Sequence, residues 1–176
     1  GETKIFQIEK CTFESKTVNI NGGTTKCTTE IDMNDETTIT MNEQTIIQTP
    51  LLKSNGNDLN ITRGIIEVGE IQINEDDEEL EMNLENTTMK ITTCPFETKE
   101  INVNSGKIEC QTMKFDGSTK LTINKQSEIT MNTIEMNGQL NNLDSNGIIS
   151  IYGNGKFGNN FNIDIKTHPT QCDELL

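Results

Sequence analysis

The 176-residue chain contains no tryptophan and no alanine, and it has one tyrosine and three prolines. Alanine is the best helix former, so its absence removes the usual filler of helices. Isoleucine, threonine and asparagine dominate instead and supply about 70 residues together. Isoleucine and threonine are β-branched and favour strands, whereas asparagine favours turns. The composition therefore favours an all-β fold.

Basic residues are also scarce, since Arg63 is the only arginine and the net charge is −14. Nucleic acids and anionic membrane surfaces attract surfaces rich in lysine and arginine, so we expect neither as a partner. No stretch approaches the roughly 18 consecutive apolar residues that indicate a membrane-spanning helix. The chain starts at Gly1 without a signal peptide, which we interpret as a mature or trimmed form.

Hydrophobic residues make up only 31% of the chain, but they are not scattered. They occur in short pairs of the form apolar, any residue, apolar, asparagine. This alternation places both apolar residues on one face of a short strand, and the asparagine predicts a turn after it. The pattern ends at Asn21, Asn34, Asn42, Asn74, Asn83, Asn104, Asn124, Asn132 and Asn137.

An internal repeat is the strongest feature of the sequence. The segment Cys11–Cys27 aligns with Cys94–Cys110, and 8 of its 17 residues are identical. After an apparent seven-residue insertion at 111–117, the alignment resumes between 28–42 and 118–132. We predict one copy at 1–87, a second at 88–171 and the start of a third at 172–176. The chain is then a fragment of a longer repetitive polypeptide.

Two architectures fit these short strands. One is a right-handed parallel β-helix, a solenoid with two inward side chains per strand and asparagines stacked at its corners. The other is a tandem pair of β-sandwich domains, which usually has longer strands and an aromatic core. The join between the copies, 83–93, contains neither proline nor glycine, so the β-helix is favoured. The whole chain resembles β-solenoid surface and fibre proteins in architecture.

The repeated Cys-x16-Cys spacing predicts the disulfides Cys11–Cys27 and Cys94–Cys110. A loop of this size stabilises a fold by about 3 kcal/mol in the chain-entropy model. Disulfides imply an oxidising compartment, so we expect an extracellular or cell-surface location. A zinc site is disfavoured because the chain has no Cys-x2-Cys pair and one histidine. The fifth cysteine, Cys172, is expected to be unpaired or to join another chain.

Other candidate sites are weaker. Asn60 and Asn86 begin glycosylation sequons, so the chain is a candidate glycoprotein. The acidic run Glu75, Asp76, Asp77, Glu78 and Glu79 is a weak candidate for calcium, although a solvated loop is the simpler interpretation. His168, the only histidine, lies beside Pro169 in an irregular tail and is not expected to act as a catalytic base.

No catalytic or phosphate-binding motif occurs, and we expect no enzyme activity and no cofactor. The sequence therefore predicts a structural or adhesive repeat segment of an extracellular fibre or surface protein. Its expected partners are neighbouring repeats or further copies of the same chain. The alternative is a β-helix protein that binds or cleaves carbohydrate, with glycans as its ligands.

Overall fold

The fold is a solenoid of parallel β-strands, and each turn of the solenoid is called a coil below. The computed structural model describes residues 4–34, 37–56, 58–73, 79–96, 100–115, 118–124, 126–136, 139–145, 148–157 and 162–167. The strands are β1 (Ile5–Phe13), β2 (Thr17–Ile20), β3 (Gly23–Met33), β4 (Thr38–Met41), β5 (Thr45–Ser54), β6 (Asp58–Thr62), β7 (Ile65–Ile73), β8 (Glu79–Phe96), β9 (Glu100–Phe115), β10 (Ser118–Ile123), β11 (Ser127–Met136), β12 (Gln139–Ser145), β13 (Ile148–Phe157) and β14 (Asn162–Thr167).

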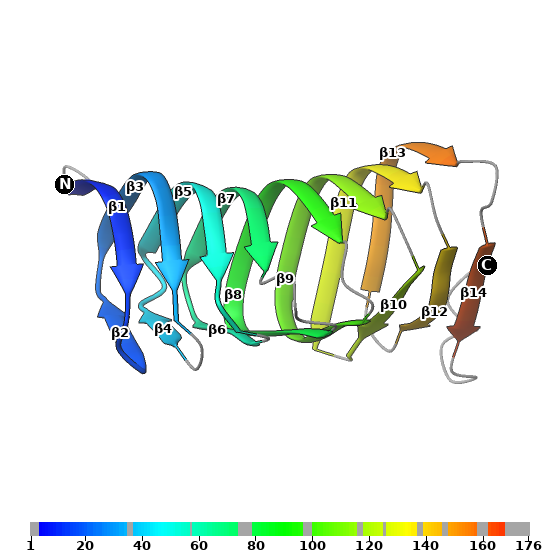
Figure 1. The fold of residues 1–176 in the computed structure, drawn as a ribbon, viewed down its shortest axis with the longest axis horizontal. Helices are drawn as coiled ribbons and strands as arrows, with labels where there is room; N and C mark the ends of the chain where they lie inside the picture. The colour runs from blue at the N-terminus through cyan, green and yellow to red at the C-terminus, as the bar shows by residue number, and fades with distance from the viewer. Residues whose placement is uncertain are drawn as a thin grey trace.

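All described strand pairs are parallel, and together they form one 14-stranded sheet wound about a long axis (Figure 1). This confirms the predicted all-β solenoid. The tandem sandwich is wrong, because a sandwich is built from antiparallel pairs.

Each coil combines a long strand with a short one. The long strands form the arched upper side in Figure 1, and β2, β4, β6, β10, β12 and β14 lie below them. β8 and β9 are continuous across a corner, so each contributes a short-strand half and then a long-strand half. Ile5 pairs with Thr24, Thr24 with Ile46 and Ile46 with Ile65, so a coil takes about 20 residues.

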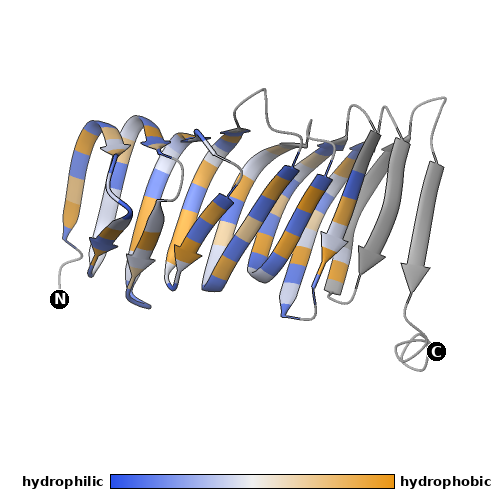
Figure 2. Cartoon of the chain, turned by 60° about the horizontal axis from the view of Figure 1, so that its bottom comes forward, coloured by the Kyte–Doolittle hydropathy of each residue, from blue (hydrophilic) through white to orange (hydrophobic). Residues whose placement is uncertain are grey.

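The apolar pairs of the sequence point inward and form one thin core along the axis. In β4, Ile39 and Met41 are buried while Thr38 and Thr40 face outward. Figure 2 shows the resulting alternation of apolar and polar residues along the strands. Full burial of such a side chain contributes about 1.5–3 kcal/mol, and every coil adds several of them. A low apolar fraction is therefore enough for a narrow solenoid.

β5, β7, β8, β9 and β11 bend where the inward–outward alternation slips by one residue. Ile91 and Cys94 are both buried, although two residues separate them, and Met131 and Ile134 repeat this spacing. The pairing register of β11 with β13 also shifts between Met131 and Thr133. The turn predicted at Asn132 is therefore wrong, because β11 passes through this residue and bends there. Asn83 and Asn104 likewise lie inside strands.

Buried hydroxyl groups close the corners between strands. Thr45 is fully buried, and its Oγ1 lies 2.7 Å from Asn42 Oδ1 and 3.2 Å from Ile20 O of the preceding coil. Ser127 Oγ donates to Val103 O of the preceding coil at 2.9 Å. Because every such hydroxyl has a partner, these polar side chains can occupy the core without a desolvation penalty.

The structure corrects the second half of the repeat alignment. β4 and β10 are both short strands, so Ile39–Asn42 corresponds to Leu121–Asn124 and not to residues 129–132, which lie in a long strand. The seven-residue insertion is therefore wrong. The copies differ at the bend by one residue, because three residues separate buried Cys27 from Ile31 and two separate Cys110 from Met113. The similar tetrapeptides in both strand types caused the misalignment.

Candidate functional site

A groove of about 780 Å³ runs along the outside of the solenoid, where successive long strands bend. At the bend, outward residues flank an inward one, so each strand presents two residues to the groove. One row follows the strand register and continues to Thr130: Lys26, Gln48, Glu67, Lys90 and Glu109. The other row consists of Thr28, Pro50, Gly69, Thr92, Gln111 and Asn132.

Most of the charged side chains in the groove pair with one another, either between neighbouring strands or within one strand. Gln48 Nε2 donates to Glu67 Oε2 at 2.7 Å, and Lys90 Nζ lies 3.4 Å from Glu67 Oε1. Lys107 Nζ lies 3.0 Å from Glu109 Oε1. The groove holds three lysines and two glutamates, so it is not acidic although the chain carries a charge of −14.

These groups can form hydrogen bonds with an extended polar ligand. The lining offers amides, hydroxyls, ammonium groups and carboxylates, and it contains no aromatic side chain among its described residues. The strand backbones are already paired within the sheet, so a bound chain would be recognised by side chains. The groove is not among the sites predicted from the sequence, because a slip in alternation resembles the end of one strand and the start of another. The recurring spacing of two inward residues separated by two others could have indicated it.

Two disulfides lie under this groove. Cys11 joins Cys27 with a Cα–Cα distance of 5.8 Å, and Cys94 joins Cys110 with a distance of 6.4 Å. Both distances fall within the usual range, and all four residues are buried. In the register Ile8 pairs with Cys27, so each bond runs diagonally between consecutive coils. The pairs agree with the repeated spacing and indicate an oxidising environment.

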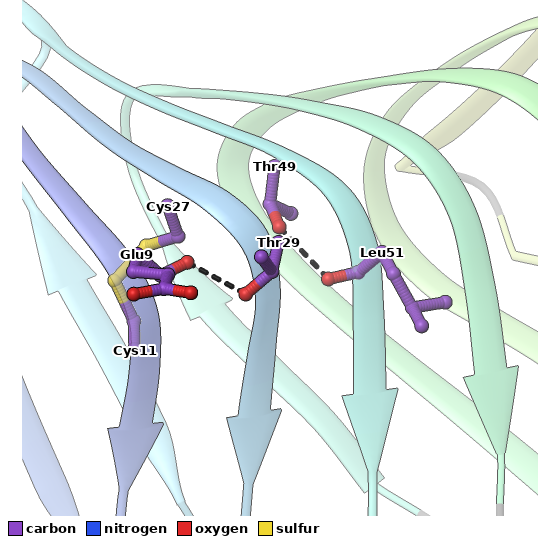
Figure 3. The surroundings of a disulfide bond; sticks show 6 residues. All are labelled: Glu9, Cys11, Cys27, Thr29, Thr49 and Leu51. Atoms are coloured by element: carbon purple, nitrogen blue, oxygen red, sulfur yellow. Dashed lines mark hydrogen bonds between the residues drawn. A yellow bond between two sulfur atoms is a disulfide. The ribbon is translucent and has the colours of Figure 1, made fainter.

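Figure 3 shows the first disulfide between β1 and β3. Next to it, Thr29 Oγ1 donates to Glu9 O at 2.7 Å, which is a second link between the same two strands at the bend. One strand further along, Thr49 Oγ1 donates to Leu51 O at 2.8 Å. Threonine hydroxyls thus satisfy backbone carbonyls where the regular ladder is interrupted.

The predicted sequons differ in their surroundings. Asn86 is exposed at the corner inside β8 and has a left-handed backbone with a φ of 52°. Asn60 is half-buried in β6, and its Oδ1 accepts a hydrogen bond from Asn83 Nδ2. The two candidates are therefore not equivalent, since a glycan on Asn60 would displace an interaction between coils.

The structure does not test the candidate metal site. Glu75, Asp76, Asp77 and Glu78 lie outside the described residues, as do His168 and Cys172. Glu79 begins β8, and its Oε1 accepts a hydrogen bond from Asn102 Nδ2 at 2.6 Å. Within the part of the chain that the structure describes, no three His, Cys, Asp or Glu side chains come together to hold a metal. Arg63 is exposed at the corner before β7 and does not line the groove.

An asparagine ladder runs parallel to the axis. Asn83 Nδ2 donates to Asn60 Oδ1 at 2.9 Å, Asn104 to Asn83 at 2.9 Å, and Asn124 to Asn104 at 2.7 Å. A side-chain amide carries both a donor and an acceptor, so identical residues on successive coils satisfy each other. Stacked asparagines were expected from the architecture, and three of the four ladder members end a predicted strand motif.

Ion pairs also link coils outside the groove. Lys10 Nζ lies 2.6 Å from Glu30 Oε1, and Lys53 Nζ lies 2.7 Å from Glu30 Oε2. Hydrogen bonds from Lys10 and Lys53 hold the pKa of Glu30 below its usual value. Hydrogen bonds to Glu30 and Asp32 raise the pKa of Lys10. Glutamate and lysine thus alternate along the axis, which prevents like charges from facing each other.

The chain matches no protein-family model. Neither a curated protein nor a solved structure matches it significantly. Among the described residues, no helix has the length and apolar character that crossing a membrane requires. The fold and the groove therefore carry the functional argument alone.

Proposed function

We propose that the chain is a non-enzymatic structural or adhesive segment of an extracellular fibre or cell-surface protein. The observation that supports this proposal most directly is the parallel pairing that connects all strands from β1 to β14 in one sheet. Apart from the strands of the first and last described coils, every strand pairs with the coils on both sides of it, so bending or stretching the solenoid breaks many hydrogen bonds together. Such a molecule suits a stiff spacer.

The links between coils support the same function. Disulfides join β1 to β3 and β8 to β9, and the asparagine ladder and ion pairs connect further coils. Covalent and polar links of this kind oppose unravelling from an end. The disulfides also favour a location outside the cell, because disulfides persist in an oxidising environment.

Three measurements test this proposal. Small-angle X-ray scattering should give an elongated rod for the monomer, and reduction should lower its resistance to protease. An antibody against the chain should label intact source cells or their surrounding matrix. A compact scattering profile, or labelling only after permeabilisation, would contradict the proposal.

The groove supports a second candidate function, the binding of a neutral polysaccharide. Its acidic and basic groups are largely paired, and the remaining lining offers hydroxyls and amides to a polyol. The net charge of −14 disfavours an anionic polymer. A groove crossing several coils suits an extended chain.

A glycan array with neutral and acidic polysaccharides tests this candidate. Binding of neutral chains should decrease in Glu67→Gln, which keeps the side-chain shape but loses the charge facing Lys90. Glu81→Gln, in the short-strand half of β8 outside the groove, is the matched control. Equal effects of both substitutions, or no binding, would exclude the groove as a glycan site.

A further inference from the structure

The first coil leaves one face of the core uncovered. β1 and β2 pair with β3 and β4 and have no described partner on their other side. Ile5 and Phe6 are 68% and 64% exposed. The end of the coil forms a hollow of about 530 Å³, whose apolar lining consists of Phe6, Ile8, Phe13, Val18 and Ile20 with Cys11.

The second repeat of the chain shows what the equivalent face packs against. The residues 83 positions after Phe6 and Ile8 are Met89 and Ile91, which are 0% and 3% exposed. The counterparts of Val18 and Ile20, which are Ile101 and Val103, are both 0% exposed. They are buried because a preceding coil, β7 with the first half of β8, packs against them.

The backbone of β1 also has N–H groups available for hydrogen bonds to a preceding coil. Thr88 N donates to Gly64 O of the preceding coil at 3.1 Å, and Ile5 is the counterpart of Thr88. Lys4 O accepts from Thr24 N, so the neighbouring N–H groups of Ile5 and Gln7 point away from β3. β1 also contains no proline, a residue that commonly protects the exposed edge of a sheet.

The last described coil repeats the coil that covers this face within the chain. The tripeptide Gly-Ile-Ile at 64–66 recurs at 147–149, again 83 residues later, and β13 follows it as β7 follows the first. β13 pairs with β11, and β14 with β12, and neither has a described partner on the outer side. The two ends are thus the two halves of an interface that the chain already forms internally.

We propose that β13 and β14 of another molecule of the same protein pair in parallel with β1 and β2, so that chains join head to tail. The register follows that of β7 on β8, which places Ile148 against Ile5, Ile149 against Phe6 and Ile151 against Ile8. The inference rests on the proposed function as a rod segment. Because the two contact faces differ, the contact repeats and generates a filament.

Cysteine cross-linking tests the register directly. In the full 176-residue chain carrying Cys172→Ser, the pair Ile5→Cys and Ile148→Cys should give a ladder of covalent oligomers on oxidation. Paired residues of neighbouring strands lie about 5 Å apart, within reach of a disulfide. The matched control combines Ile5→Cys with Ser150→Cys, which is displaced by two residues and should cross-link much less. Equal cross-linking of both pairs, or of neither, would overturn the register.

Sedimentation velocity tests the association itself. The mean sedimentation coefficient of the wild-type chain should rise with concentration. Gln7→Pro removes an N–H that has no partner among the described residues, and it should raise the concentration needed by about tenfold, as one lost backbone hydrogen bond would. Gln7→Thr should associate like the wild type. Circular dichroism verifies that both variants fold.

A wild-type chain that stays monomeric at every concentration would overturn this inference, as would equal association of Gln7→Pro and Gln7→Thr. Scattering from the monomer separates the two proposals. An elongated monomer that does not associate contradicts the interface alone, whereas a compact monomer contradicts the proposed rod as well.

Discussion

Asn83 donates a hydrogen bond from Nδ2 to Oδ1 of Asn60, 2.9 Å away on the preceding coil, and accepts one from Asn104. It is therefore an interior member of the asparagine ladder. Asn83→Ala removes both bonds and leaves half-buried partners without them. A net contribution of about 1 kcal/mol per bond predicts a loss of about 2 kcal/mol in the free energy of unfolding.

Urea unfolding followed by circular dichroism measures this loss. Asn132→Ala is the control, because Asn132 is an exposed groove residue without a described hydrogen-bond partner. It should change the stability by less than about 0.5 kcal/mol. Equal effects at both positions would show that the ladder contributes nothing specific.

Two glycines with similar backbones separate steric contact from backbone strain. Gly106 and Gly22 have φ values of 85° and 82°, a backbone conformation that residues other than glycine rarely adopt. A Cβ on Gly106 would lie 2.1 Å from Leu84 O, whereas a Cβ on Gly22 would lie 3.8 Å from its nearest neighbour. Gly22→Ala should therefore cost about 1–2 kcal/mol for the left-handed conformation alone.

Gly106→Ala must also displace the backbone of the preceding coil, and it should cost more than about 3 kcal/mol or prevent folding. Urea midpoints measure the loss of stability in each variant that folds. The yield of soluble protein with a β-type circular dichroism spectrum shows whether Gly106→Ala folds at all. A similar loss of stability in the two variants would mean that the close contact between Gly106 and Leu84 is easily relieved.

The fold could be predicted from the sequence because its signals are local and repeated. Pairs such as Ile39 and Met41 fix the inward face of a strand, and the repeat of Cys11–Cys27 fixes which coils are equivalent. The groove could not be predicted in the same way. It depends on the slip between Ile91 and Cys94, which in one dimension looks like the end of one strand and the start of another.

The asparagine ladder illustrates the same limit. Asn83, Asn104 and Asn124 were recognised as recurring residues that follow apolar pairs, but Asn60 lies between two buried residues and ends no motif. Which asparagines stack depends on the register between coils, and that register includes irregularities between Asn83 and Thr88. Local sequence does not specify these shifts.

The disulfides should supply a measurable part of the stability. The double substitution Cys94→Ser with Cys110→Ser opens a loop with a sequence separation of 16, and the chain-entropy model predicts a loss of about 3 kcal/mol. Denaturant unfolding of non-reduced protein measures it. Cys172→Ser leaves both pairs intact and should have no comparable effect, and intact-mass analysis should find two disulfides in the native chain. Finding all cysteines reduced in native material would refute the proposed extracellular location.

Glu30 should make the stability depend on pH in the acidic range. Its pKa is lower in the folded chain than the ordinary value of 4.5, so folding favours the ionised form. This contribution is complete above the unfolded-state pKa and disappears as the pH falls through the folded-state pKa. The stability difference between wild type and Glu30→Gln should therefore be largest at neutral pH and shrink in acid.

Urea midpoints measured across the acidic range at low salt test this dependence, and added salt should reduce the difference because Lys10 and Lys53 reach Glu30 at the surface. Glu43→Gln is the control, since Glu43 is exposed and has no described ion pair. A difference between wild type and Glu30→Gln that stays constant with pH would contradict the assigned ion pairs.

The two sequons should differ in use when the chain is secreted from eukaryotic cells. Asn86 is exposed at a corner, whereas Asn60 lies within the ladder and is bonded to Asn83. We therefore expect a glycan on Asn86 and none on Asn60. Thr88→Ala abolishes the sequon of Asn86 without replacing Asn86 itself, whose left-handed backbone suits asparagine. This variant should lose the glycan mass on a denaturing gel, and Thr62→Ala should keep it. Loss of the glycan in Thr62→Ala alone would reverse the assignment and imply that the ladder opens at Asn60.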